Sequence, residues 1–71
     1  MPKLLSSKEI TKVLEKNNFT LVSQKGSHMK WRKHGKEILT VIVPANKREI
    51  PIGTMRSIIR QSGLSEEDFD I

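Results

Sequence analysis

The spacing of the hydrophobic residues changes along the chain, first from a helical period to a strand-like one. Ile10, Val13 and Leu14 recur at helical intervals between lysines and glutamates, which predicts an amphipathic helix. Ser6 is the predicted N-cap of this helix, and Glu9 three residues later completes a capping box. The two asparagines that follow end the helix and precede the strand-like pattern.

Three short segments of strand-like composition come next, roughly Phe19–Lys25, His28–Lys33 and Glu37–Val43. The links between them, Gly26-Ser27 and His34-Gly35-Lys36, are short enough to predict an antiparallel meander. The third segment is apolar at nearly every position, so we expect it to be a central strand or a strand covered on both faces.

A second helix is predicted to follow, with Gly53 or Thr54 as its N-cap. Met55, Ile58, Ile59 and, past its end, Leu64 give this helix a buried stripe. Gly63 is placed as the residue that ends it, because glycine readily adopts the left-handed conformation found at helix C-termini.

The last residues resemble the start of one further short helix. Ser65 is its predicted cap, and we expect this turn either to fray or to dock through Phe69. The predicted order is therefore α-β-β-β-α, an α+β fold in which two helices cover one face of a three-stranded antiparallel sheet. This is the layout of a double-stranded-RNA-binding domain, although a fold alone does not establish a function.

The chain has 71 residues and no cysteine, so we expect one small domain, residues 1–71, without disulfides. No apolar run approaches the roughly 20 residues of a membrane span, and the first residues lack the apolar core of a signal peptide. A cytoplasmic protein is therefore expected.

Charge is distributed unevenly along the chain, whose formal net charge is +5. Residues 25–60 carry +7, whereas residues 61–71 carry −4. A basic block of this kind favours a nucleic-acid partner, because each neutralised phosphate releases condensed counterions. A solvated basic face without a specific partner is the alternative.

The segment Lys25-Gly26-Ser27-His28 carries the clearest candidate chemistry. Histidine can both accept and donate a proton near neutral pH, since its ordinary pKa is about 6.5. Backbone N–H groups at Gly26 can approach a phosphate closely, and the Ser27 hydroxyl and Lys25 can also contact it. An ordinary hairpin with an incidental histidine is the simpler interpretation.

The period of two in the second strand places His28, Lys30 and Arg32 on one face, with Met29 and Trp31 on the other. The first face is a candidate phosphate-binding surface. Trp31 followed by a cation can serve as a base-stacking platform. Because Trp31 lies on the same face of the strand as Met29, opposite His28, we predict that it belongs to the core instead.

His34 is six positions from His28, about 20 Å along an extended strand, so the two cannot act jointly on one phosphate. We expect His34 to cap the turn between the second and third strands. Arg56 and Arg60 lie four residues apart on the second helix and are either phosphate contacts or part of a solvated face. No H-E-x-x-H motif or paired-acid cluster is present, so neither a metal nor another cofactor is expected.

Taken together, several short segments resemble the HicA family of mRNA interferase toxins from toxin-antitoxin systems. The matching segments, in order, are Ser7–Ile10, Gln24–His28, Val41–Pro44, Ile50–Thr54 and Ile58–Leu64. The resemblance implies a double-stranded-RNA-binding-like fold, RNA cleavage without a metal, His28 as the catalytic residue and a cognate HicB-type antitoxin. Many members have a further histidine after the third strand's proline, where this chain has Ala45-Asn46.

The expected mechanism has neutral His28 removing the proton of a ribose 2′-hydroxyl, while nearby cations and turn N–H groups stabilise the phosphoryl charge. The expected catalytic residue is His28; the expected RNA and phosphate contacts are Lys25, Gly26, Ser27, Lys30, Arg32, Arg56 and Arg60. Two alternatives stay open: a non-catalytic RNA-binding module, and a protein-interaction domain whose basic block binds an acidic partner.

Overall fold

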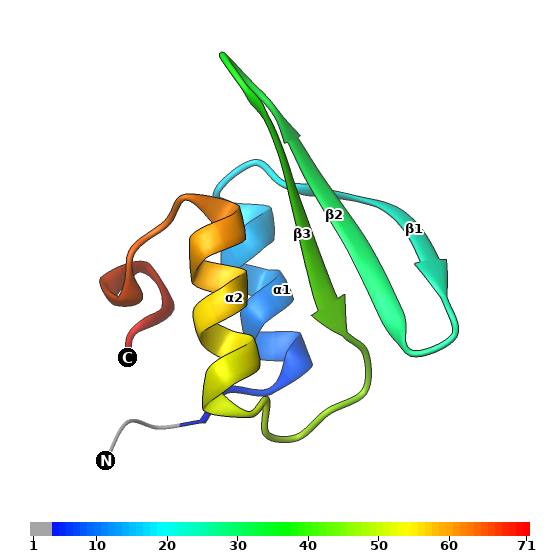
Figure 1. Cartoon of the computed structure of the whole chain (residues 1–71), viewed down its shortest axis with the longest axis vertical. Helices are drawn as coiled ribbons and strands as arrows, with labels where there is room; N and C mark the ends of the chain where they lie inside the picture. Colours follow the sequence, from blue (N-terminus) through cyan, green and yellow to red (C-terminus); the bar gives the residue numbers. More distant parts are fainter. Residues whose placement is uncertain (1–3) are drawn as a thin grey trace.

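The chain folds into two layers, a three-stranded antiparallel sheet and a pair of helices that covers one of its faces (Figure 1). The computed structural model describes residues 4–71. Its elements are α1 (Ser7–Lys16), β1 (Thr20–Lys25), β2 (His28–His34), β3 (Ile38–Pro44), α2 (Ile52–Ser62) and the 3-10 helix η1 (Glu66–Phe69). This order confirms the predicted α-β-β-β-α fold.

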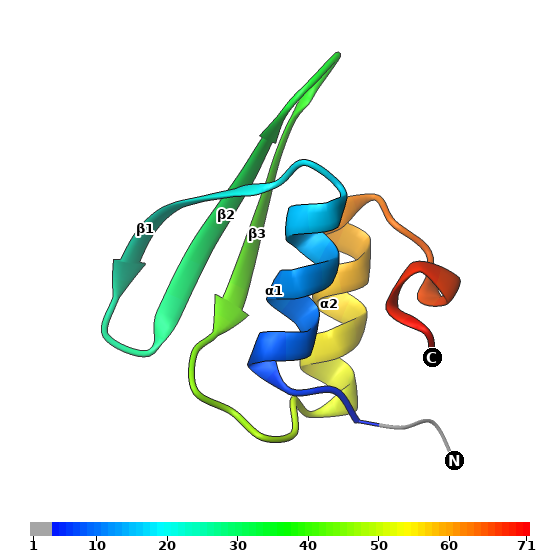
Figure 2. The same ribbon diagram turned by 180° about the vertical axis from the view of Figure 1, so that it is seen from behind.

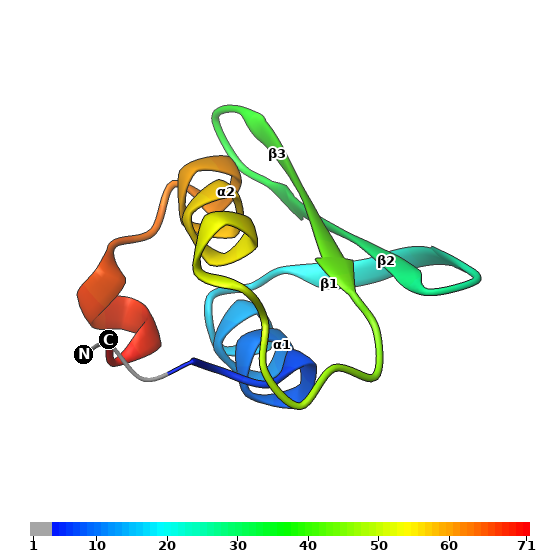
Figure 3. The same ribbon diagram turned by 60° about the horizontal axis from the view of Figure 1, so that its bottom comes forward.

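The two helices lie side by side, as the view from behind shows (Figure 2). Seen from below, the sheet lies on one side of the helix pair and η1 on the other (Figure 3). Among residues 4–71, no helix is long and apolar enough to cross a membrane.

The start of α1 is fixed by local hydrogen bonds, as the sequence predicts. The Glu9 N–H donates to Ser6 Oγ at 3.1 Å, and the Ser6 N–H donates to Glu9 Oε1 at 2.9 Å. Leu5 and Ile10, which flank this capping box, are both buried in the core. Their contact fixes the angle at which the chain enters the helix.

The prediction that the third strand is central or covered on both faces is wrong, because the strand order is β1-β2-β3 and β3 is an edge. Val41 and Val43 are fully buried under the helices, whereas the alternating residues Ile38 and Ile42 are 64% and 36% exposed. The outward N–H of Ile42 donates to Gln61 Oε1 of α2 at 3.0 Å. The apolar segment is therefore an edge strand, and a helix side chain accepts a hydrogen bond from its outward Ile42 N–H.

The second helix begins earlier than predicted, at Ile52, with Pro51 as its N-cap instead of Gly53 or Thr54. The Met55 N–H donates to the Pro51 carbonyl at 2.9 Å, which forms the first helical bond, and no side chain caps this end. Gly63 ends α2 with φ +71°, in agreement with the prediction.

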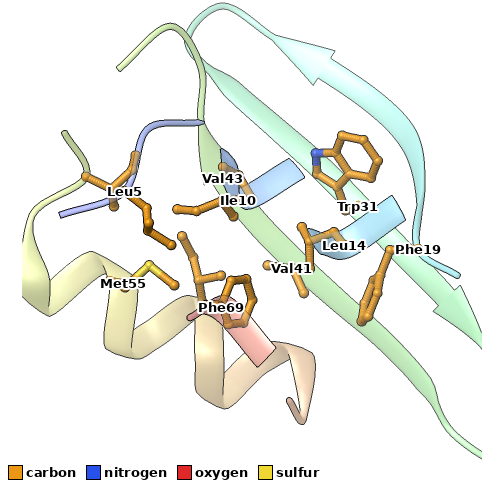
Figure 4. Close-up of a cluster of buried hydrophobic side chains, with 11 residues drawn as sticks. Leu5, Ile10, Leu14, Phe19, Trp31, Val41, Val43, Met55 and Phe69 are labelled. Atoms are coloured by element: carbon orange, nitrogen blue, oxygen red, sulfur yellow. The ribbon is translucent and has the colours of Figure 1, made fainter. Parts of the chain in front are cut away.

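The hydrophobic core lies between the helices and the covered face of the sheet (Figure 4). Trp31 is 6% exposed, so the tryptophan belongs to the core as predicted. Phe69 is 1% exposed, so of the two alternatives for the C-terminal turn, docking is the one found. Ser65 caps η1, the short helix that ends at Phe69. The remaining core residues are Leu5, Ile10, Leu14, Phe19, Val41, Val43, Ile50, Met55 and Ile58.

Candidate functional site

The face of the sheet turned away from the helices collects the polar side chains of the strands, and no helix of residues 4–71 covers it. Residues paired directly across neighbouring strands share a face of the sheet. The register therefore arranges this surface, which we call the open face, in three rows: Lys25, His28 and Pro44; Ser23, Lys30 and Ile42; Thr20, Arg32 and Thr40.

His28 is the first residue of β2 and lies between Lys25 of β1 and Pro44 of β3. Gly26 makes this position possible, since its φ of +56° is a conformation that other residues rarely adopt. The Ser27 carbonyl accepts a hydrogen bond from the Ala45 N–H at 2.7 Å, which ties the turn to the loop after β3. The exposed imidazole has no hydrogen-bond partner within the described residues, so both ring nitrogens are available to a ligand.

A shallow cavity of about 220 Å³ opens on this face beside His28. Lys25 and Lys30 line it together with the imidazole, and no carboxylate does. Ser23, Met29 and Ile42 supply the rest of its lining. Such a cavity favours an anion next to a group that transfers protons, because both lysines attract negative charge.

A β-bulge in β1 changes which residues accompany Arg32. In a regular ladder Leu21 would lie opposite Arg32, but the register shifts between Leu21 and Ser23 and brings Thr20 there instead. Leu21 pairs with Trp31 and remains 47% exposed. The bulge thereby removes a bulky apolar side chain from the row around Arg32.

Arg32 is held by a side-chain hydrogen bond, whereas Lys30 has none within the described residues. The Arg32 Nε donates to Thr40 Oγ1 at 3.2 Å, and the Thr20 hydroxyl donates to the Arg32 carbonyl at 3.4 Å. Arg32 is half-buried and Lys30 is exposed. Along an extended strand Arg32 lies about 13 Å from His28, too far to share one phosphate, so it suits a more distant part of a polyanion.

The arginines of α2 do not share the open face. Arg56 and Arg60 are exposed on the helix layer, and Arg56 lines a separate cavity with Glu66 of η1. The structure therefore gathers Lys25, Gly26, Ser27 and Lys30 around His28, extends the surface to Arg32, and places the two arginines elsewhere.

His34 lies at the far end of β2, opposite Ile38, and is exposed. The turn that follows is closed by the Gly35 N–H, which donates to the Glu37 carbonyl at 3.2 Å. The expectation that His34 caps this turn is wrong, because its side chain has no hydrogen bond within the described residues. No group of three or more histidine, aspartate or glutamate side chains in residues 4–71 is placed to hold a metal ion.

Trp31 cannot act as a base-stacking platform, because it is buried against the helices. Its Nε1 is buried without a hydrogen-bond partner. The residues that sequence reasoning missed are Ser23 and Ile42, which line the cavity beside His28. Counting outward from the two-residue turn that separates Lys25 and His28 would have placed Ser23 opposite Lys30.

Comparison with known proteins gives one family. The family model described as HicA toxin of bacterial toxin-antitoxin matches residues 7–64, which span α1 through the end of α2. No match was found among curated proteins. The matched range includes the whole open face, whereas η1 lies beyond it.

Proposed function

Because this chain belongs to the HicA family of bacterial toxin-antitoxin toxins, we propose that it is a metal-independent endoribonuclease that cleaves mRNA with His28 as its single catalytic residue. A HicB-type antitoxin is the proposed inhibitor. One observation carries this proposal: an exposed, unpartnered imidazole lies between Lys25 and the end of β3, at a cavity whose other charged residue is also a lysine.

The proposed reaction is an internal displacement at phosphorus. Neutral His28 takes the proton of the ribose 2′-hydroxyl, and the 2′-oxygen bonds to the adjacent phosphorus as the bond from phosphorus to the 5′-oxygen breaks. The products are a 2′,3′-cyclic phosphate and a 5′-hydroxyl. The protonated imidazole, or a water molecule that it polarises, returns the proton to the leaving oxygen.

Charge stabilisation is assigned to groups around the imidazole. Lys25 and Lys30 flank the cavity, so they lie on the side where the phosphoryl oxygens gain negative charge. Gly26 carries no side chain, and no atom of a residue beyond its chain neighbours lies within 4 Å of the place where a Cβ would be. A phosphate can therefore approach the turn closely. The Ser27 hydroxyl, exposed in the same turn, supplies a further donor.

The remaining cations are assigned to RNA outside the cleaved bond. Arg32 is oriented by Thr40 on the open face and contacts a phosphate farther along the strand. Arg56 and Arg60 contact the RNA only where it passes over α2, so their contribution to binding is electrostatic and peripheral.

The 2′-hydroxyl is the feature of the substrate that tests this proposal. A defined RNA is incubated with the protein in EDTA to locate one cleaved bond, and the same RNA is then made with a single 2′-deoxy nucleotide immediately 5′ of that bond. We expect cleavage at that bond to disappear while other bonds are still cut, because the nucleophile has been removed. Cleavage of the deoxy-substituted bond at the original rate would refute the proposed function.

A further inference from the structure

A second cavity, of about 340 Å³, lies on the covered side of the sheet at the same end as His28. Its walls come from the first turns of α1, the adjoining ends of β1 and β2, and the loop after β3. Gln24 and Met29 are paired across the two strands and contribute one wall, and Ala45 and Asn46 contribute another. The volume is at the small end of the roughly 300–1,000 Å³ typical of small-molecule sites, so it suits one compact group and not a folded segment.

This cavity adjoins the proposed cleavage site through shared residues. Met29 lines both this cavity and the shallow one beside His28. Pro44 is paired with His28, and the next residue, Ala45, lines the second cavity and donates its N–H to the Ser27 carbonyl at 2.7 Å. The two cavities therefore adjoin the same end of the β1–β2 hairpin.

Two side-chain amides remain free to hydrogen-bond in this cavity, beside the ammonium groups of Lys8 and Lys47. The Ser7 hydroxyl is already engaged, since it donates to the Pro44 carbonyl at 2.6 Å and accepts from the Lys47 N–H at 2.9 Å. The side-chain amides of Gln24 and Asn46 have no hydrogen-bond partner within the described residues and are exposed to a ligand. Each amide offers both donors and an acceptor, the combination that the edge of a nucleobase requires.

The other properties of the cavity also fit a nucleotide. Met29 and Ala45 supply the apolar part of the cavity lining, of which Met29 is the more exposed. Lys8 and Lys47 also line the cavity, and no carboxylate does. A lining of lysines, apolar side chains and two unpaired amides favours an uncharged ring on a negatively charged backbone.

We propose that this cavity binds one unpaired nucleobase of the RNA next to the cleaved bond, and that Gln24 and Asn46 select it by hydrogen bonds to its edge. The inference rests on the proposed ribonuclease function and adds a base preference at one position of the substrate. Sequence-specific recognition of RNA depends on bases that are not paired, since only these expose their edges to side chains.

The experiment compares Asn46→Gly with Asn18→Gly. Both asparagines have positive φ, +58° and +71°, so glycine keeps each backbone conformation while it removes the amide. Asn46 lines the cavity, whereas Asn18 lies beyond the C-terminal end of α1, at the opposite end of the helix. Each protein cuts a pool of RNAs in which the positions flanking the cleaved bond are varied to all four bases.

We expect the wild type and Asn18→Gly to prefer one base, or one pair of bases, at a flanking position. Asn46→Gly should lose roughly tenfold or more of that preference, because a bidentate amide contact typically supplies this much discrimination. Asn18→Gly should keep the wild-type cleavage rate, and Asn46→Gly should keep the melting temperature of Asn18→Gly, which separates a specificity role from a folding defect. Gln24→Ala, on an exposed side chain, should lower the same preference.

Four results would overturn the inference. A wild type that cuts without any flanking preference, or an Asn46→Gly protein with the full preference, contradicts the base pocket but leaves the ribonuclease intact. Unchanged preference with weakened inhibition by the antitoxin would assign the cavity to the protein partner. The last result combines two experiments. If the wild type cuts no RNA, and the backbone amide NMR signals of His28→Ala protein do not shift with adenosine, cytidine, guanosine or uridine monophosphate, both the proposed function and the base pocket are wrong.

Discussion

The buried position of Phe69 predicts that the end of the chain contributes a large share of the stability. Its ring is 1% exposed and belongs to the core that includes α1, α2 and the covered face of the sheet (Figure 4). Replacing a buried phenylalanine with alanine typically costs about 3–5 kcal/mol, through lost burial and the cavity that remains. A 71-residue chain has roughly 4–11 kcal/mol of stability in total. Phe69→Ala should therefore remove about a third or more of it.

Thermal and urea unfolding followed by circular dichroism would measure this loss. At about 4–8 °C per kcal/mol for a domain of this size, we expect the melting temperature to fall by at least 12 °C. Glu67→Ala changes an exposed residue of the same 3-10 helix and should shift the melting temperature by no more than a few degrees. If Phe69→Ala costs less than about 1 kcal/mol, the docking of this segment is refuted.

Three further predictions concern the sheet edge, the C-terminal cap and the open face. Gln61→Ala should expose the outer amide of β3 and increase self-association, measured by light scattering after size-exclusion chromatography, whereas a monomer at all concentrations would contradict the edge-capping role. The N–H and hydroxyl of Ser65 lower the pKa of Asp68 below its ordinary 3.8 by donating to its carboxylate. The melting temperature of Asp68→Asn should therefore lie below that of the wild type at pH 7, and the difference should shrink as the pH falls below 3.8, whereas a difference independent of pH would contradict the assignment. Log affinity for single-stranded RNA falls linearly with log salt concentration, and Lys30→Ala should make this negative slope shallower by about 0.7. Lys36→Ala, outside the open face, should leave the slope unchanged. Equal slopes for the two variants would remove Lys30 from the RNA contacts.

The parts of the fold that the sequence predicts are those that depend on neighbouring residues. Ser6 and Glu9 form their capping box within one turn, and Gly63 needs only its own backbone conformation to end α2. The alternation of faces along the strand places Trp31 on the same side as Met29, and this assigns it to the core. Such signals are local, so a single sequence contains them.

The parts that were missed depend on contacts between distant elements. Whether β3 is central or at an edge depends on the order of the strands, and an apolar edge is acceptable here because Gln61 of α2 satisfies its outer amide. The bulge that brings Thr20 opposite Arg32 depends on the pairing of β1 with β2. The start of α2 at Pro51 shows that a helix can begin without a side-chain cap.

The candidate site divides in the same way. Alternation along β2 predicts that His28, Lys30 and Arg32 share a face, and the register confirms it. The separation of Arg56 from this face follows from two predictions taken together, that both helices cover one face of the sheet and that Trp31 faces the core, although the two were not combined for the arginines.

The most direct test of the central claim compares His28→Ala with His34→Ala. The two histidines lie at opposite ends of β2, both are exposed, and neither has a hydrogen-bond partner within the described residues, so the substitutions are matched in chemistry and in structural cost. Each protein and the wild type are incubated with a defined mRNA in EDTA, and the fragment ends are analysed. We predict that the wild type and His34→Ala leave 2′,3′-cyclic phosphate ends while His28→Ala binds the RNA without cutting it. Cleavage by His28→Ala at the wild-type rate would contradict the assignment of His28 as the catalytic residue.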